Sequence, residues 1–187
     1  MKEMDNILKI KAVLLYILQQ SERDRHNVYS IVKTAYYAQQ LHFVKWALPL
    51  YKDKIAALQF GPVPSTIYDV LKMARGDRKV LNYYRNSYLR SVADAIGFQD
   101  EIFYAKENAD CDVLSPSNIE CLDEAIAKVA SMDFDEIVVD THGEEWNRVW
   151  NSKSRFMDDI MIAKDGGADE SIISYLQEAL DLEEMLG

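Results

Sequence analysis

Apolar residues recur at helical spacing through most of the chain, and this pattern predicts a mainly α-helical protein. Residues 6–19 carry apolar side chains on several helical faces, so we expect a central, buried helix. After a polar segment, Asn27 is a suitable N-cap for a second helix, whose apolar stripe runs from Val28 to Ala38. The first part of the chain therefore predicts two consecutive helices joined by a polar loop.

The pattern changes after Trp46, since Pro49 interrupts helical continuation. Residues 55–60 form a short apolar run that predicts an extended segment, ended sharply by the glycine and prolines of residues 61–64. Proline is tolerated in the first turn of a helix, so a third helix is predicted to start at residue 64 or 65 and to stop at Gly76. The segment is thus expected to be a rigid corner between a strand and a helix.

Beyond that corner, residues 80–96 have apolar positions at helical spacing and precede Gly97, a good helix stop. Two short apolar runs follow at residues 102–104 and 111–114. Their separation by a polar stretch predicts a β-hairpin between these two runs.

The C-terminal half is expected to be helical again. Three capping-box patterns predict helix starts, and residues 172–186 form a last amphipathic stripe after a glycine-containing turn at residues 165–167. The three patterns are Ser117 with Glu120, Asp133 with Glu136, and Thr141 with Glu144. The expected fold class is mainly α, a compact multi-helix domain with a small β-hairpin or short sheet, and residues 1–187 are expected to form one domain.

Charge and hydropathy narrow the classes of partner. The formal net charge is −10, which disfavours nucleic acid because phosphate binding needs a basic face, and it favours a basic protein partner instead. The basic cluster between Arg75 and Arg90 is interpreted as solvated helix surface. Acidic residues before the first apolar run argue against a signal peptide, and no run is long enough to span a bilayer. We therefore expect a cytoplasmic protein that is not in a membrane.

Motifs for catalysis or metal binding are absent from the sequence. The three histidines are scattered, no GxSxG elbow is present, and neither cysteine has a catalytic or paired context, so both are expected to be reduced. A meeting of His42 and His142 with carboxylates in space would reopen the question of an enzyme. The expectation is a non-enzyme without cofactor or metal.

Aromatic residues are concentrated around residues 36–51 and 83–88. Tyrosine and tryptophan are favoured at binding surfaces because they bury a large area and keep a polar tip, although core packing is the commoner role. Together with the acidic charge, this favours a protein that works by binding another protein.

Two groups of motifs, in the same order along the chain, resemble those of the Panacea domain family, the SocA-like antitoxins that also occur as phage-associated proteins. The first comprises Lys33 to Ala38, a following Leu41-His42, and Phe60-Gly61-Pro62-Val63-Pro64 ahead of Ile67-Tyr68. The second comprises Leu114 to Ser117 and, later, Thr141-His142 with Trp146. Residues 77–113 and those after Trp150 match this pattern only loosely.

This resemblance implies a mainly helical, non-enzymatic antitoxin that neutralises a cognate protein toxin by direct contact. One mode described for the family delivers the toxin to a protease as an adaptor, which adds a protease or chaperone to the expected partners. Five side chains are predicted to bind the partner: Tyr37, His42, Phe60, Pro62 and Trp146. The motif residues Gly61, Pro62, Val63, Pro64, Thr141 and His142 are assigned a structural role.

Two alternatives stay open at this point. The first is a phage-related or regulatory adaptor that binds host machinery without any toxin. The second is a small DNA-binding regulator, because an early pair of helices can resemble a helix-turn-helix, although the acidic charge argues against it.

Overall fold

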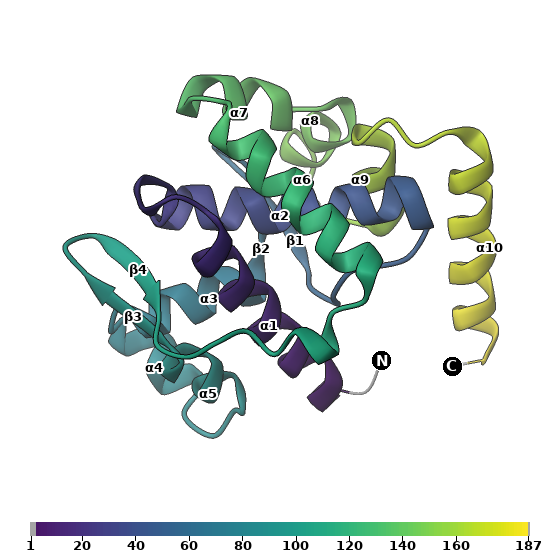
Figure 1. Ribbon diagram of the computed structural model, residues 1–187. Coiled ribbons are helices and arrows are strands. Elements are labelled where there is room, and N and C mark those ends of the chain that lie inside the picture. Colours follow the sequence, from purple (N-terminus) through teal and green to yellow (C-terminus); the bar gives the residue numbers. More distant parts are fainter. Residues whose placement is uncertain (1–2, 187) are drawn as a thin grey trace.

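The computed structural model of the protein describes residues 3–186, and these are mainly helical with small antiparallel sheets, as the sequence pattern predicts. Helix α2 (Val28–Trp46) runs through the middle of the molecule, with α1 (Glu3–Gln20) and α6 (Pro116–Ala130) packed against it (Figure 1). Most of α1 from Ile7 to Leu18 is buried, which confirms the predicted central helix. A short 3₁₀ turn, η1 (Arg23–Arg25), connects the two helices.

Helix α2 begins and ends at residues whose chemistry fits those positions. The side chain of Asn27 accepts a hydrogen bond from the backbone N–H of Ser30 at 2.9 Å, so the predicted N-cap is confirmed. At the other end the helix stops at Ala47, which adopts a left-handed conformation with φ of 50°. Pro49 lies in the loop that follows, outside the helix.

A three-stranded antiparallel sheet follows, with the strand order β2-β1-β5. Its strands are β1 (Ile55–Leu58), β2 (Gly61–Pro64) and β5 (Phe156–Met157), and the first confirms the predicted extended segment. The glycine and prolines of residues 61–64 form a strand rather than only a break. Proline is tolerated there because β2 lies at the edge of the sheet, where missing N–H donors leave no neighbouring strand unpaired. Helix α3 (Ser65–Ala74) starts at the predicted place and ends before Gly76, whose φ is 89°.

The next segment differs from the prediction. A single helix over residues 80–96 is wrong, because two short helices, α4 (Arg78–Tyr83) and α5 (Leu89–Asp94), occupy most of it. The hairpin pairs β3 (Ile96–Gln99) with β4 (Ile102–Ala105), while the run at 111–114 is largely the 3₁₀ turn η2 (Cys111–Val113). Gly97 is therefore not a helix stop but a strand residue facing Tyr104, whose ring occupies the space that a Cβ atom would need. Cross-strand packing over a glycine is invisible to helical periodicity.

After η2, the described part of the chain contains five helices together with strand β5. Their bounds are α6 as given above, α7 (Phe134–Thr141), α8 (Glu144–Trp150), α9 (Asp159–Asp165) and α10 (Glu170–Leu186). In Figure 1, α10 stands along the outer side of the molecule beside α9 and the end of α2.

The capping predictions for these helices had mixed outcomes. The capping box of Asp133 and Glu136 is confirmed. The one at Ser117 is wrong by two residues, because Ser115 and Asn118 form the box of α6 and a proline follows at the first helical position. The one at Thr141 is also wrong, since Thr141 is the last residue of α7 and its hydroxyl bonds back to the Ile137 carbonyl oxygen at 2.8 Å.

Within residues 3–186, no helix is long and apolar enough to cross a membrane. Both cysteines have free thiols; Cys111 is exposed and Cys121 is buried in α6.

Candidate functional site

An apolar cavity of about 610 Å³ lies where the start of α2, the β1–β2 turn, and helices α7 and α8 meet. We call it the aromatic cavity, because five aromatic side chains form much of its wall. The lining residues that matter most are Tyr29, Lys33, Phe60, Gly61, Phe134 and Trp150. The volume falls within the range typical of ligand sites, roughly 300–1,000 Å³, although this cavity is open to the surface.

Local structure presents the three aromatic side chains of the rim. Phe60 lies in the two-residue turn between β1 and β2 and is 50% exposed. Phe134 is the first residue of α7, directly after its N-cap, and is 46% exposed. Trp150 ends α8 and is 47% exposed. The ring of Phe134 contacts those of Phe60 and Tyr29, with centroid distances of 5.5 Å and 4.6 Å.

The wall between these aromatics holds a buried lysine. Lys33 is 1% exposed, and its Nζ atom donates to the carbonyl oxygen of Pro62 at 3.3 Å and to Oγ1 of Thr141 at 3.2 Å. Gly61 has a φ of 95°, and a Cβ atom there would collide with both Lys33 Nζ and Thr141 Oγ1. Glycine is therefore required at position 61 for two reasons: the positive φ of its backbone and the close approach of the Lys33 and Thr141 side chains.

The electrostatics of this wall follow from burial. Desolvation lowers the pKa of Lys33 to about 7, and neither of its two hydrogen-bond acceptors is a carboxylate that would stabilise the ammonium. Burial, and then the charge of Asp135, raise the pKa of Tyr29 to about 12. The hydroxyl of Tyr29 is buried and lacks a hydrogen-bond partner within the described part of the chain. The wall thus contains two polar groups whose hydrogen-bonding capacity is not filled.

Behind the cavity, aromatic rings form a continuous stack along α8. His142 stacks on Trp146 with a centroid distance of 3.7 Å, and Trp146 stacks on Trp150 at 5.6 Å. Trp146 itself is buried. The carboxylate of Asp165, at the end of α9, accepts hydrogen bonds from the backbone N–H groups of Glu145 and Trp146 at 2.8 and 2.9 Å, so it caps α8 from a distant part of the chain.

Tyr37 is buried beside this region and contacts α7 through its hydroxyl. The hydroxyl donates to Oδ2 of Asp140 at 2.6 Å, and the same oxygen pairs with Nζ of Lys128 at 2.7 Å. Lys128 also lies over the ring of Tyr37, 4.2 Å from its centroid. Burial, followed by the bond to Asp140, raises the pKa of Tyr37, so this phenol is a neutral donor that ties α2 to α7.

His42 lies near the other end of α2 and has different neighbours. Its Nδ1 atom is 2.7 Å from the carbonyl oxygen of Leu48, and its Nε2 atom is 3.0 Å from the side-chain nitrogen of Asn118. These contacts fit a neutral ring that donates through Nδ1 and accepts through Nε2, and burial lowers its pKa accordingly. His42 therefore joins α2, its following loop and the start of α6, and none of these partners lines the aromatic cavity.

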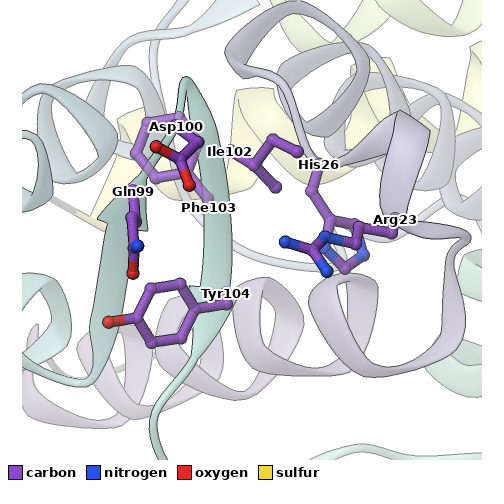
Figure 2. Close-up of a pocket in the computed structure, with 7 residues that line it drawn as sticks. All are labelled: Arg23, His26, Gln99, Asp100, Ile102, Phe103 and Tyr104. Atoms are coloured by element: carbon purple, nitrogen blue, oxygen red, sulfur yellow. The ribbon is translucent and has the colours of Figure 1, made fainter.

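A second cavity, of about 470 Å³, lies between η1 and the β3–β4 hairpin. Figure 2 shows Arg23 and His26 on one side of it, with Gln99, Asp100 and Tyr104 on the hairpin side. The backbone N–H of Phe103 donates to the carbonyl oxygen of His26 at 2.9 Å and holds the hairpin here. Its polar side chains are largely solvated, so we regard the aromatic cavity as the stronger candidate site.

Across residues 3–186, no group of three or more His, Cys, Asp or Glu side chains is arranged to hold a metal ion. His42 and His142 belong to separate contacts, the first with α6 and the second with Trp146.

The motif residues of the candidate site fall within one family match. The family model described as "Antitoxin SocA-like, Panacea domain" matches residues 31–147, more than half of the chain. The chain belongs to this family. Searches of curated proteins and of solved structures found no significant match.

This Panacea-domain protein contains most of the site within the matched range. Lys33, Phe60, Phe134 and Thr141 lie inside it, whereas Trp150 lies just beyond its end. Of the five predicted partner contacts, only Phe60 is exposed; the structure buries Tyr37, His42, Pro62 and Trp146. Gly61, Pro62, Thr141 and His142 come together around Lys33 and Trp146.

Sequence reasoning missed several members of the Panacea-domain site. The sequence patterns assign no partner-binding role to Phe134, Trp150 or Tyr29. Lys33 offered the best available signal, because a lysine among the apolar positions of a buried helix is uncommon.

Proposed function

We propose that this protein neutralises a cognate protein toxin by direct contact and that the aromatic cavity is the surface on which the toxin docks. The observation that carries the proposal is the exposure of Phe60, Phe134 and Trp150 around one apolar cavity in a SocA-like antitoxin domain. The proposal attributes no catalytic step to the protein.

An exposed cluster of aromatic rings favours protein binding for a physical reason. Each half-exposed ring keeps apolar surface in contact with water, and a partner side chain that enters the cavity removes that surface from solvent. Aromatic residues dominate binding energy in many interfaces because they bury a large area with few rotatable bonds. A specific interface covers about 1,600 Å² in total, so the cavity would be its centre rather than its whole extent.

The acidic side chains near the cavity indicate the charge of the toxin surface that would face them. Asp133 is the N-cap of α7 and Asp135 and Glu136 lie in its first turn, all close to Phe134 in a chain of net charge −10. Acidic residues at the edge of an interface speed association with a basic partner. We therefore propose a toxin whose docking face is basic at its periphery.

The predicted contacts take different roles in this proposal. Phe60 contacts the toxin directly. Tyr37, Pro62 and Trp146 act from inside the protein, because Tyr37 fixes α7 through Asp140, Pro62 holds Lys33, and Trp146 supports Trp150. His42 stabilises the start of α6, away from the cavity.

The test is co-expression with the protein encoded beside it, scored by cell growth. Phe60→Ala and Phe134→Ala should reduce neutralisation by roughly tenfold or more, as expected for interface anchors, while thermal unfolding of the purified variants stays close to that of the wild type. Tyr88→Ala is the matched control, since Tyr88 is exposed directly before α5 and does not line the cavity. A neighbouring protein that is harmless alone, or full neutralisation by both phenylalanine variants, would contradict the proposal.

Delivery of the toxin to a protease is a finer form of this function. It predicts that the half-life of the toxin shortens when the antitoxin is present and lengthens again in a protease-deficient host. A toxin that persists in a stable complex would instead make the antitoxin a stoichiometric inhibitor.

A further inference from the structure

Lys33 has an unfilled donor position in the wall of the aromatic cavity. A protonated lysine carries three N–H donors, and the structure gives Nζ two acceptors, the Pro62 carbonyl oxygen and Thr141 Oγ1. Both acceptors are uncharged, and none of the ion pairs found within residues 3–186 includes Lys33. A buried ammonium without a counter-charge is unstable, so this side chain has much to gain from a negative oxygen.

Tyr29 supplies a second unused donor in the same wall. Its buried hydroxyl has no hydrogen-bond partner, and Lys33 Nζ lies 5.5 Å from the centre of its ring. The remainder of the wall is mainly apolar, from Val28 and Val32 on α2 to the aromatic rim. A cavity with apolar walls and two donors matches a ligand with an apolar body and an acceptor group.

The other titratable groups near Lys33 do not supply the missing charge. His142 has its pKa lowered by burial and then by the charge of Lys33, so it is a neutral neighbour. Asp140 is held by Lys128 and Tyr37. Asp135 acts on Tyr29 from the rim, where its charge opposes the entry of an anion.

We propose that Lys33 makes the aromatic cavity selective for a large apolar group that carries a carboxylate. The toxin supplies this group as an apolar side chain beside an Asp or Glu, or beside its own C-terminal carboxylate. This inference rests on the proposed function, because it places the toxin in the same cavity. The carboxylate compensates the lysine charge and the apolar body fills the space between the rings.

Two fluorescent probes that share one aromatic body test the selectivity. Anilinonaphthalene sulfonate carries an anionic group, N-phenylnaphthylamine lacks it, and both brighten in apolar surroundings. In Lys33→Met the affinity for the anionic probe should fall roughly tenfold, or about 1.4 kcal/mol, while the affinity for the neutral probe stays nearly unchanged. Lys79→Met, on the surface of α4, controls for net charge. Phe134→Ala should lower the affinity for both probes, which would show that they bind in the aromatic cavity.

The dependence on pH gives a second readout. Between about pH 7 and about pH 9 the wild type should lose affinity for the anionic probe as Lys33 deprotonates, whereas Lys33→Met should stay flat over that range. An anionic-probe affinity that is unchanged in Lys33→Met, or equal losses for both probes, would overturn the inference.

A competition experiment separates this inference from the proposed function. The toxin should displace the anionic probe from the wild-type protein. A toxin that binds and is neutralised but leaves the probe in place refutes the inference and leaves the proposed function intact. If the toxin does not bind at all, the proposed function is wrong, and the toxin cannot be the source of the carboxylate. Anion-selective probe binding in that case would point to a free apolar acid as the occupant of the cavity.

Discussion

Lys33 on α2 donates from Nζ to the carbonyl oxygen of Pro62 on β2, 3.3 Å away, and so fastens the edge strand of the sheet to the central helix. Thr141 receives a second bond from the same nitrogen and adds the end of α7 to this contact. Three segments that are far apart in the sequence thus meet at one buried amine beside the aromatic cavity.

Glycine at position 61 is expected to be essential for this contact. Gly61→Ala should lower the free energy of unfolding by about 2–4 kcal/mol, because the new Cβ atom strains a backbone with positive φ and collides with Lys33 and Thr141. Gly76→Ala is the matched control, since Gly76 has a φ of 89° but nothing within 4 Å of its Cβ position. It should cost only about 1 kcal/mol of backbone strain. Denaturant titration measures both, and equal losses would show that the collision is unimportant.

The stability of the protein should depend on pH through Lys33. The pKa of Lys33 is about 7 in the folded protein and near its ordinary value of 10.5 when the chain unfolds. Between these values the unfolded chain binds more protons, so the contribution of Lys33 to stability rises with pH and its penalty is fully present below pH 7.

The comparison with Lys33→Met isolates this effect. The free energy of unfolding of the wild type should gain on that of the variant by up to about 1.4 kcal/mol per pH unit from neutral to alkaline pH, the limit for one proton. Denaturant midpoints at several pH values measure the difference. Parallel curves for the two proteins would show that Lys33 is not titrating in this window.

The turn of the β3–β4 hairpin stores strain that a single substitution should release. Asp100 and Glu101 both have positive φ, at 52° and 61°, in a two-residue connection that usually contains glycine. Glu101→Gly should raise the free energy of unfolding by about 0.5–1 kcal/mol. Gly97→Ala, in the adjacent strand, should lower it, because its Cβ atom collides with the Tyr104 ring. Thermal unfolding of the two variants distinguishes these opposite effects.

Substitutions of Trp146 and Phe60 are expected to affect the stability of the fold to different extents. Trp146 is buried in the stack with His142, so Trp146→Ala should destabilise the protein by about 3–5 kcal/mol. Phe60 is half exposed, and Phe60→Ala should cost less than about 1 kcal/mol. Unfolding curves recorded beside the neutralisation assay would show whether loss of function in each variant follows loss of the fold.

Much of the local structure could be predicted because its causes are local. The apolar runs of α1 and α2, the N-cap at Asn27, the strand at residues 55–58 and the capping box at Asp133 each depend on neighbours within a few residues. The motif of residues 60–64 was also a reliable sign of the family, together with Thr141, His142 and Trp146.

The start of α8 could not be predicted because its cap comes from a distant residue: Asp165, at the end of α9, accepts hydrogen bonds from the backbone N–H groups of Glu145 and Trp146. Asp53 in the same way accepts hydrogen bonds from the backbone N–H groups of Thr66 and Ile67 in α3, although proline and the apolar stripe were enough to predict where that helix starts. The hairpin partner of β4 was missed for a related reason, since Gly97 is placed by the ring of Tyr104 across the strands.

The sequence by itself therefore determined the helical class, the corner at residues 60–64 and the family, because periodicity, proline and glycine act on the nearby backbone. Only the tertiary structure decided which side chains are exposed and which donors lack a partner. Tyr37, His42 and Trp146 became internal contacts, while Phe60, Phe134 and Trp150 gathered around Lys33. Burial and charge compensation are properties of segments brought together in space, so no local pattern could reveal a cationic group held without a counter-charge in an apolar wall.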